Sequence, residues 1–172
     1  MELYTVETKY INYLSNFQVH IWDNKENGNL RPYVGIVLNI GDYKYYAPLT
    51  SPKPKHNNMP ERLDLIRLEY KKRLIAVINL NNIIPVSDRL ISKIDMDNLT
   101  DRKYKELLNI EIIQIRRKQS VILKNAKILY NKMTKFRNDS QNAKLVSICY
   151  DFHMLEQKLD EYMSAYGYWQ RD

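Results

Sequence analysis

The sequence is short of the residues from which most cofactor sites are built. It contains one cysteine, three histidines and four glycines among 172 residues. His20, His56 and His153 lie far apart, and neither H-x-x-x-H nor C-x-x-C occurs. The sequence therefore predicts no metal site and no cofactor. G-x-x-x-x-G-K and G-x-G-x-x-G are also absent, which argues against nucleotide-driven chemistry.

Long apolar runs are missing as well. No segment approaches the roughly 20 apolar residues that cross a bilayer, and MELYTVETKYINYL lacks the basic start and apolar core of a signal peptide. The single Cys149 can form no internal disulfide, and its apolar neighbours favour a buried thiol in a reducing compartment. We therefore expect a cytoplasmic protein without a membrane partner. Its length fits one domain, residues 1–172.

Acidic residues are outnumbered. The chain has 27 Lys and Arg against 20 Asp and Glu, a net charge of +7, which favours a polyanionic partner. Residues 111–137 hold eight of these cations and one acid, Glu111. The 14 tyrosines are compatible with stacking on RNA bases and equally with a tyrosine-rich core, so their number does not distinguish an RNA-binding surface from a core.

The first half of the chain has the composition of strands. Residues 33–40 and 43–49 are β-rich and are joined across Gly41-Asp42, which predicts a tight antiparallel hairpin. Further strands are predicted within residues 3–7, 63–70 and 73–86, and a short helix at 9–14. The proline-containing segments NLRP and SPKPKHNNMP are expected to be loops.

The second half has the apolar period of helices. Ile115, Ile122 and Leu129 recur every seven residues and predict one long basic helix from about Thr100. A C-terminal amphipathic helix is predicted from Leu145 to Met163, after FRNDSQN, with Ser140 or Asn142 as its cap. The fold class is therefore α+β, with both halves sharing one core.

One predicted loop has the composition of a reactive site. The segment YYAPLTSPKPKH has no acid that could act as base or metal ligand. Its hydroxyls and cations can bind and neutralise a phosphate, and RNA cleavage by its own 2'-hydroxyl needs no nucleophile from the protein. An ordinary proline-stiffened surface turn is the alternative. The residues concerned are Thr50, Ser51, Lys53, Lys55 and His56.

Three segments carry a family resemblance. RPYVGIVLNIGDYKYYAPLTSPKPKH, together with DRKYKELLNIEIIQIRRKQSVILKNAKILY and YDFHMLEQK, resembles the toxins of type III toxin-antitoxin systems, the ToxN, AbiQ and CptN group. The likeness covers nearly the whole chain. It implies a compact twisted antiparallel sheet like that of the Kid and MazF toxins, with added helices. It also implies a metal-independent endoribonuclease that leaves a 2',3'-cyclic phosphate.

The resemblance also implies partners. The expected antitoxin is a tandem-repeat pseudoknot RNA, which the toxin processes and which then holds it in a closed toxin-RNA ring; no DNA partner is expected. Cellular or phage mRNAs would be the substrates, in abortive infection against phage. Two other functions stay open: a non-catalytic RNA-binding module, and a MazF-like ribonuclease inhibited by a protein.

Site residues follow from both lines of reasoning. The resemblance assigns catalysis to Ser51, Thr50, Lys53 and Tyr33. We expect Ser51 and Thr50 to donate hydrogen bonds to the scissile phosphate, and Lys53 to stabilise its charge or protonate the leaving 5'-oxygen. A tyrosine would accept the 2' proton, with Tyr43, Tyr45 and Tyr46 as alternatives to Tyr33, and His56 is a second-choice acid or base. The predicted RNA-binding residues are Arg31, Tyr45, Lys55, His56, Arg116, Arg117, Lys118, Lys124 and Lys127.

Overall fold

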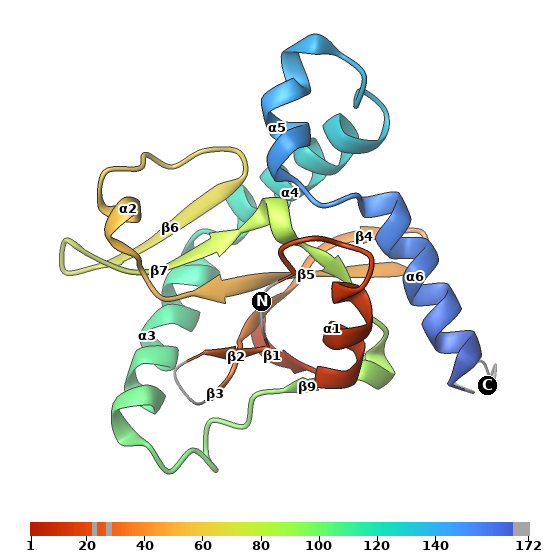
Figure 1. Cartoon of the computed structure of the whole chain (residues 1–172). Helices are drawn as coiled ribbons and strands as arrows, with labels where there is room; N and C mark the ends of the chain where they lie inside the picture. Colours follow the sequence, from red (N-terminus) through yellow and green to blue (C-terminus); the bar gives the residue numbers. More distant parts are fainter. Residues whose placement is uncertain (22–23, 27–28, 167–172) are drawn as a thin grey trace.

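A seven-stranded sheet forms the centre of the molecule. Figure 1 shows the chain as a computed structural model, which describes residues 1–21, 24–26 and 29–166. Every strand pair is antiparallel, in the order β6-β7-β5-β4-β1-β9, with β8 beside β5. A separate two-stranded sheet pairs β2 with β3. The strands are β1 Glu2–Val6, β2 Lys25–Glu26, β3 Asn29–Leu30, β4 Tyr33–Ile40, β5 Tyr43–Thr50, β6 Leu65–Tyr70, β7 Arg73–Asn79, β8 Ile84–Pro85 and β9 Ile91–Lys93.

Two hairpins build most of this sheet. The predicted β4–β5 hairpin is confirmed: Ile40 pairs with Tyr43 across a two-residue turn in which Gly41 has a φ of +54°. β6 and β7 form the second hairpin, whose turn is Lys71-Lys72. Both lysines adopt a positive φ, 49° and 61°, a conformation that suits the right-handed twist of two-residue hairpins.

The helices surround the sheet, and the predicted α+β class is confirmed. In the view of Figure 1, α1 lies in front of the sheet and α4 passes behind it. Buried side chains from both halves of the chain form one apolar cluster. The helices are α1 Thr8–Ser15, α2 Pro54–Asn57, α3 Arg102–Arg117, α4 Gln119–Thr134, α5 Ala143–Ile148 and α6 Phe152–Ala165, with 3-10 turns η1 Leu80–Asn82, η2 Asp88–Leu90 and η3 Ser140–Asn142.

The long basic helix is divided in two. α3 ends and α4 begins at Lys118, whose φ of −97° and ψ of 6° are not helical. No proline or glycine marks this position in the sequence. Ile115 and Ile122 are both fully buried on either side of it, so the apolar stripe continues across the break and conceals it from a periodicity argument.

The C-terminal helix is also interrupted. α5 ends at Ile148, and α6 begins after Asp151, whose carboxylate accepts a hydrogen bond from the Met154 N–H at 3.2 Å. The predicted continuous helix is therefore wrong. Asn142 does precede α5, but its side chain donates to Phe136 O at 2.9 Å and makes no cap bond. Among the described residues, no helix is long and apolar enough to cross a membrane.

Candidate active site

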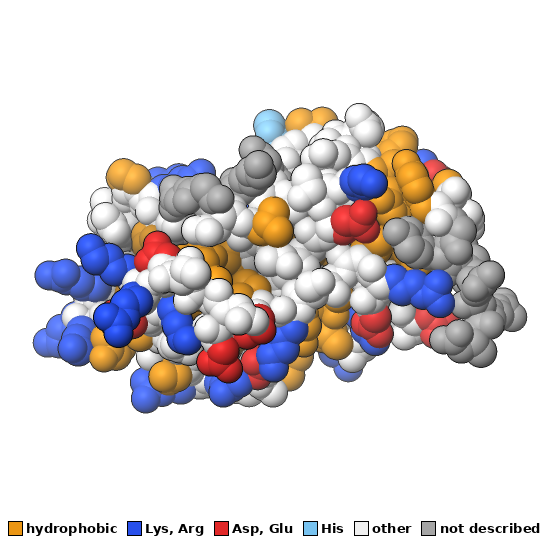
Figure 2. Space-filling view, turned by 90° about the horizontal axis from the view of Figure 1, so that it is seen from below, with side chains coloured by type: hydrophobic (Ala, Val, Ile, Leu, Met, Phe, Trp, Pro, Cys, Tyr) orange, Lys and Arg blue, Asp and Glu red, His pale blue; other side chains and the backbone are white. Residues whose placement is uncertain are grey.

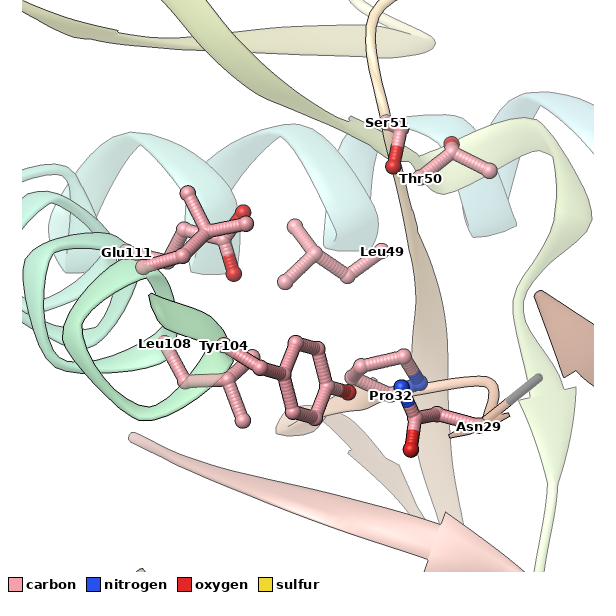
Figure 3. A pocket seen from close by; sticks show the side chains of 9 residues that line it. Asn29, Pro32, Leu49, Thr50, Ser51, Tyr104, Leu108 and Glu111 are labelled. Carbon is pink, nitrogen blue, oxygen red and sulfur yellow. The ribbon is translucent and has the colours of Figure 1, made fainter. Parts of the chain in front are cut away.

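The end of β5 places a buried threonine beside an exposed serine. Thr50 pairs with Val77 of β7 and is 2% exposed. Its hydroxyl donates to Val77 O at 3.3 Å and accepts from Asn79 Nδ2 at 2.7 Å. Ser51 is exposed, and its hydroxyl points into the pocket of Figure 3, whereas that of Thr50 points away. These contacts give the Thr50 hydroxyl partners within the sheet, at the strand end that carries Ser51, and the prediction that Thr50 donates to a phosphate stays a prediction.

The residues after Ser51 form a braced turn rather than an open loop. Pro54 begins the four-residue helix α2. The Lys53 N–H donates to His56 Nδ1 at 3.1 Å, and the His56 N–H donates to Lys53 O at 2.8 Å. From β6, the Arg67 guanidinium donates to His56 O and to Met59 O. These hydrogen bonds fix the backbone of Lys53, two residues after Ser51.

His56 lies inside this turn and not on the RNA-accessible surface. It is 2% exposed. Burial lowers its pKa below the usual value, and the nearby charges of Lys55, Lys53 and Arg67 lower it further. Because Nδ1 accepts a hydrogen bond, the neutral ring carries its proton on Nε2. The burial contradicts the predicted RNA contact, and the occupied Nδ1 argues against an acid or base role.

The hairpin brings the R-P-Y motif next to Ser51. Leu49 N–H donates to Pro32 O at 2.9 Å, and Tyr33 pairs with Pro48. Arg31 therefore lies at the same edge of the sheet as the end of β5. Its side chain is largely buried, at 6% exposure, and its N–H donates to Asn24 O at 2.7 Å. Arg31 therefore does not lie on an open surface, and it is not among the residues that line the pocket beside Ser51.

The tyrosines do not supply the expected base. Tyr33 is 3% exposed, and burial raises the pKa of its hydroxyl well above the usual range, although the charge of Arg31 opposes this shift. A raised pKa makes the phenolate harder to form, which is the reverse of what a general base requires. The structure thus gives no support to a proton-accepting role for Tyr33.

Tyr45 is misassigned as an RNA-binding residue. Its ring is fully buried, and its hydroxyl donates to Glu156 Oε1 on α6 at 2.7 Å. Tyr43 begins the same strand, roughly 23 Å from Thr50 at about 3.3 Å per residue. Its hydroxyl donates to Asp160 Oδ2 at 2.6 Å. Tyr46 is buried too, at 2%, so these three side chains serve the core or the far end of the hairpin.

A helix completes the pocket with residues that the sequence reasoning missed. The pocket is an open hollow with a cavity volume of about 90 Å³, and α3 supplies one wall. Glu111 on this wall is only 4% exposed, and in Figure 3 its carboxylate points from α3 toward Leu49 of β5. A signal existed: Leu108, Glu111 and Ile115 are the buried residues of α3, so a carboxylate occupies a place in the apolar stripe. The lining residues are Asn29, Pro32, Leu49, Thr50, Ser51, Tyr104, Leu107, Leu108 and Glu111.

The side chains that commonly bind metals are dispersed. Cys149 is buried, and burial with the nearby charge of Asp64 raises the pKa of its thiol to about 12. His153 lies on α6 with its Nδ1 3.0 Å from Glu156 Oε2. Within the described part of the chain, no three His, Cys, Asp or Glu side chains gather in a way that could hold a metal ion.

Comparison with known protein families identifies the family of this chain. The sequence matches the family described as "Toxin ToxN, type III toxin-antitoxin system" over residues 2–160. The chain belongs to this family. Endoribonuclease ToxN of Pectobacterium atrosepticum is 32% identical over 168 residues, which cover 94% of this chain and 94% of that protein. This member of the ToxN family is accordingly an endoribonuclease.

Solved structures of similar proteins have the same architecture. One, from a study of type III toxin-antitoxin systems and selective toxin inhibition by a non-coding RNA pseudoknot, has a TM-score of 0.83 and 26% identity, covering 94% of this chain and 96% of that one. Another, from a bacterial antiviral system regulated by a processed non-coding RNA, has a TM-score of 0.81 and 29% identity, covering 94% and 98%. The α+β arrangement is thus shared within the ToxN family.

Only part of the predicted basic surface is free of ion pairs within the protein. Arg116 forms an ion pair with Glu2, and Lys118 forms one with Glu61. Figure 2 shows Lys and Arg side chains gathered at one end of the molecule, where Figure 1 places α3 and the β6–β7 hairpin. Of the predicted cations, Lys55, Arg116, Arg117, Lys124 and Lys127 are exposed, and Arg116 is ion-paired. Lys53, next to the site, and Lys71, Lys72 and Arg73, at the turn of the β6–β7 hairpin, are exposed as well.

Proposed function

We propose that this ToxN-family endoribonuclease cuts RNA by attack of the substrate's own 2'-hydroxyl and leaves a 2',3'-cyclic phosphate. The observation that carries the proposal is the exposed Ser51 hydroxyl at a pocket mouth, next to a turn that fixes Lys53. Because the nucleophile belongs to the substrate, the protein needs only to orient the phosphate and stabilise its charge, and no metal ion is required.

Each residue has a role in this scheme. The Ser51 hydroxyl donates a hydrogen bond to a non-bridging oxygen of the scissile phosphate. Lys53 stabilises the added negative charge or protonates the leaving 5'-oxygen. Arg31 and Lys55 bind the RNA backbone. Thr50 holds the end of β5 in place for Ser51, because its own hydroxyl already donates to Val77 O.

The test compares cleavage rates on precursor RNA. Ser51→Ala should lower the rate about 10²- to 10³-fold, the usual effect of removing one donor to a developing charge. Lys53→Ala should lower it at least as much. Ser147→Ala and Lys144→Ala, exposed on α5, are matched controls that should cleave normally. Undiminished cleavage by both site variants, or activity that disappears on adding a chelator, would contradict the proposal.

We further propose that the partner of this toxin is a tandem-repeat pseudoknot RNA, which the toxin processes and which holds it in a closed toxin-RNA ring. Inhibition by an RNA pseudoknot in a structural relative supports this, as does the net charge of +7. The antiviral system of a second relative supports a role in abortive infection, with cellular or phage mRNA as the target. Adding repeat RNA should convert monomeric toxin into a discrete larger species that no longer cleaves mRNA. A protein encoded beside the toxin that inhibits it instead would favour the MazF-like alternative.

A further inference from the structure

The segment that leaves β5 at the active site ends against the outermost strand of the sheet. Thr50 pairs with Val77 of β7, and Val77 pairs with Arg67 of β6, so the three residues form one row across three strands. Neighbouring strands lie about 4.8 Å apart, which puts Arg67 about 10 Å from the end of β5. Residues 51–59, which include Lys53, span this interval, and Figure 1 shows α2 beside β6. Arg67 is therefore near this segment without lining the active-site pocket.

The Arg67 side chain holds the far end of the segment. Its guanidinium donates to His56 O and Met59 O, and its Nε donates to Glu69 Oε1 at 2.9 Å. The side chain is only 17% exposed, and hydrogen bonds from a charged donor are the stronger class. From the backbone, the Arg67 N–H donates to Glu61 Oε2 at 3.2 Å. Arg67 is thus bonded at three residues to the chain between β5 and β6.

The α2 turn transmits this restraint to Lys53. The carbonyl that Arg67 holds belongs to His56, whose N–H donates to Lys53 O at 2.8 Å. In return, the Lys53 N–H donates to His56 Nδ1 at 3.1 Å. Pro52 and Pro54 flank Lys53 with fixed φ angles, which leaves the turn few rotations that could absorb a displacement. We therefore expect loss of the Arg67 contacts to displace Lys53 as well.

We propose that Arg67 is a positioning residue for RNA cleavage, which holds the α2 turn where the Lys53 ammonium meets the scissile phosphate and does not contact RNA itself. The inference rests on the proposed role of Lys53. A misplacement of about 1 Å at a reacting group can slow a reaction about 100-fold, so a residue two strands away can govern the rate. Because Arg67 makes no phosphate contact in this role, its loss should slow the chemical step and leave RNA affinity nearly unchanged.

The first experiment measures single-turnover cleavage of precursor RNA over a range of protein concentrations, which separates the chemical step from binding. Arg67→Gln should lower the maximal rate about 10- to 100-fold. The protein concentration that gives half of the maximal rate should change less than about threefold.

Two controls separate positioning from charge and from stability. Arg73→Gln removes the same charge from an exposed position of the neighbouring strand β7. Glu156→Ala removes the acceptor of two buried tyrosine hydroxyls and destabilises the fold away from the α2 turn. Both controls should keep the maximal rate of wild type within about twofold, at a temperature where every variant is folded.

A double-mutant cycle determines whether Arg67 acts through Lys53. Lys53→Ala removes the group that is positioned, so adding Arg67→Gln should slow cleavage no further than about twofold, whereas independent residues would multiply their losses. An RNA with sulfur in place of the leaving 5'-oxygen provides a second comparison. Lys53→Ala and Arg67→Gln should respond alike to this substitution, because the same ammonium is missing in one variant and displaced in the other.

A second variant keeps the test decisive if Arg67→Gln folds poorly. Arg67→Lys keeps the charge but carries all its donors on one nitrogen, so it cannot reach Glu69 and the α2 turn together. It should lose about 3- to 10-fold in maximal rate with unchanged RNA affinity. A wild-type rate in Arg67→Lys would overturn the proposal.

The remaining outcomes distinguish this inference from the proposed function. A wild-type maximal rate in Arg67→Gln, with Lys53→Ala inactive, refutes the positioning role alone. Multiplied losses in the double variant also refute it, because Arg67 then acts by a route that does not pass through Lys53. If Lys53→Ala itself cleaves as fast as wild type, the proposed function fails and the positioning role fails with it.

Discussion

The buried tyrosines of the hairpin find their polar partners on the C-terminal half of the chain. Glu156 Oε1 accepts from the Tyr45 hydroxyl at 2.7 Å and from the Tyr130 hydroxyl at 2.8 Å. Burial, together with this shared carboxylate, raises the pKa of both phenols well above the usual range. Similarly, the hydrogen bond to Asp160 raises the pKa of Tyr43 to about 12. These side chains therefore act as neutral donors that join β5 to α4 and α6.

Removing the shared acceptor tests this role. Glu156→Ala leaves two buried hydroxyls without their acceptor and opens a small cavity, so we expect the free energy of unfolding to fall by about 2–4 kcal/mol. The measurement is urea denaturation at pH 7.5, and the exposed Glu161→Ala should change little. A loss below about 0.5 kcal/mol for Glu156→Ala would show that the network does not stabilise the fold.

At the scale of elements, the two-residue hairpins and the short turn after β5 decide where the site is. Gly41-Asp42 could be recognised from the sequence because the turn chemistry is local. The α2 turn could not, because what stabilises it is the Arg67 side chain from β6, which donates to two of its carbonyls. The proline spacing predicted a loop at these residues, whereas the contact with Arg67 stabilises a short helix there.

The α2 turn should make stability depend on pH through His56. Burial and three neighbouring cations lower its pKa in the folded protein, whereas an unfolded histidine titrates near 6.5. At pH values between the folded and the unfolded pKa, the unfolded chain binds more protons than the folded protein. The contribution of His56 to the free energy of unfolding is therefore complete above about pH 6.5 and is lost as the pH falls through the folded pKa.

The variant His56→Gln separates this contribution from that of other groups. It should cost about 1 kcal/mol at pH 8, where the hydrogen bond from the Lys53 N–H is weakened, and it should show a smaller loss of stability than wild type between pH 7 and pH 5.5. Denaturation curves at these pH values provide the comparison. Parallel losses in the two proteins would mean that His56 does not couple folding to pH.

At the scale of the whole molecule, sequence reasoning succeeded where neighbours in space are neighbours in the chain. It recognised the family from motifs spread over the chain. It grouped Ser51 and Lys53 as candidates because they share one short segment, and their roles stay predictions. It missed Glu111, because only the packing of α3 against β5 brings this residue to the pocket. It assigned Tyr45 to RNA, because tyrosine composition does not distinguish a stacking surface from a core that offers carboxylate acceptors.

The distribution of charge over the molecule predicts which cations contribute to RNA affinity. Arg116 and Lys118 already have acidic partners, so the exposed Arg117, Lys124 and Lys127 are the predicted helical cations that remain to neutralise phosphates. The triple change of these residues to Gln should weaken binding. It should also reduce the slope of log K against log salt concentration by about 2, since each lost single-strand contact accounts for about 0.7.

Binding is measured on the Ser51→Ala background, so that the repeat RNA stays intact, at salt concentrations that span tenfold. The matched control replaces the exposed Lys9, Arg89 and Lys144 with Gln; it removes the same charge from α1, η2 and α5, and should lower the affinity with a smaller change in slope. Equal slopes for the two triple variants would show that RNA responds to net charge alone and does not lie along α3 and α4. A selective decrease in the α3–α4 variant would place the phosphate track on those helices, continuous with the pocket at Ser51.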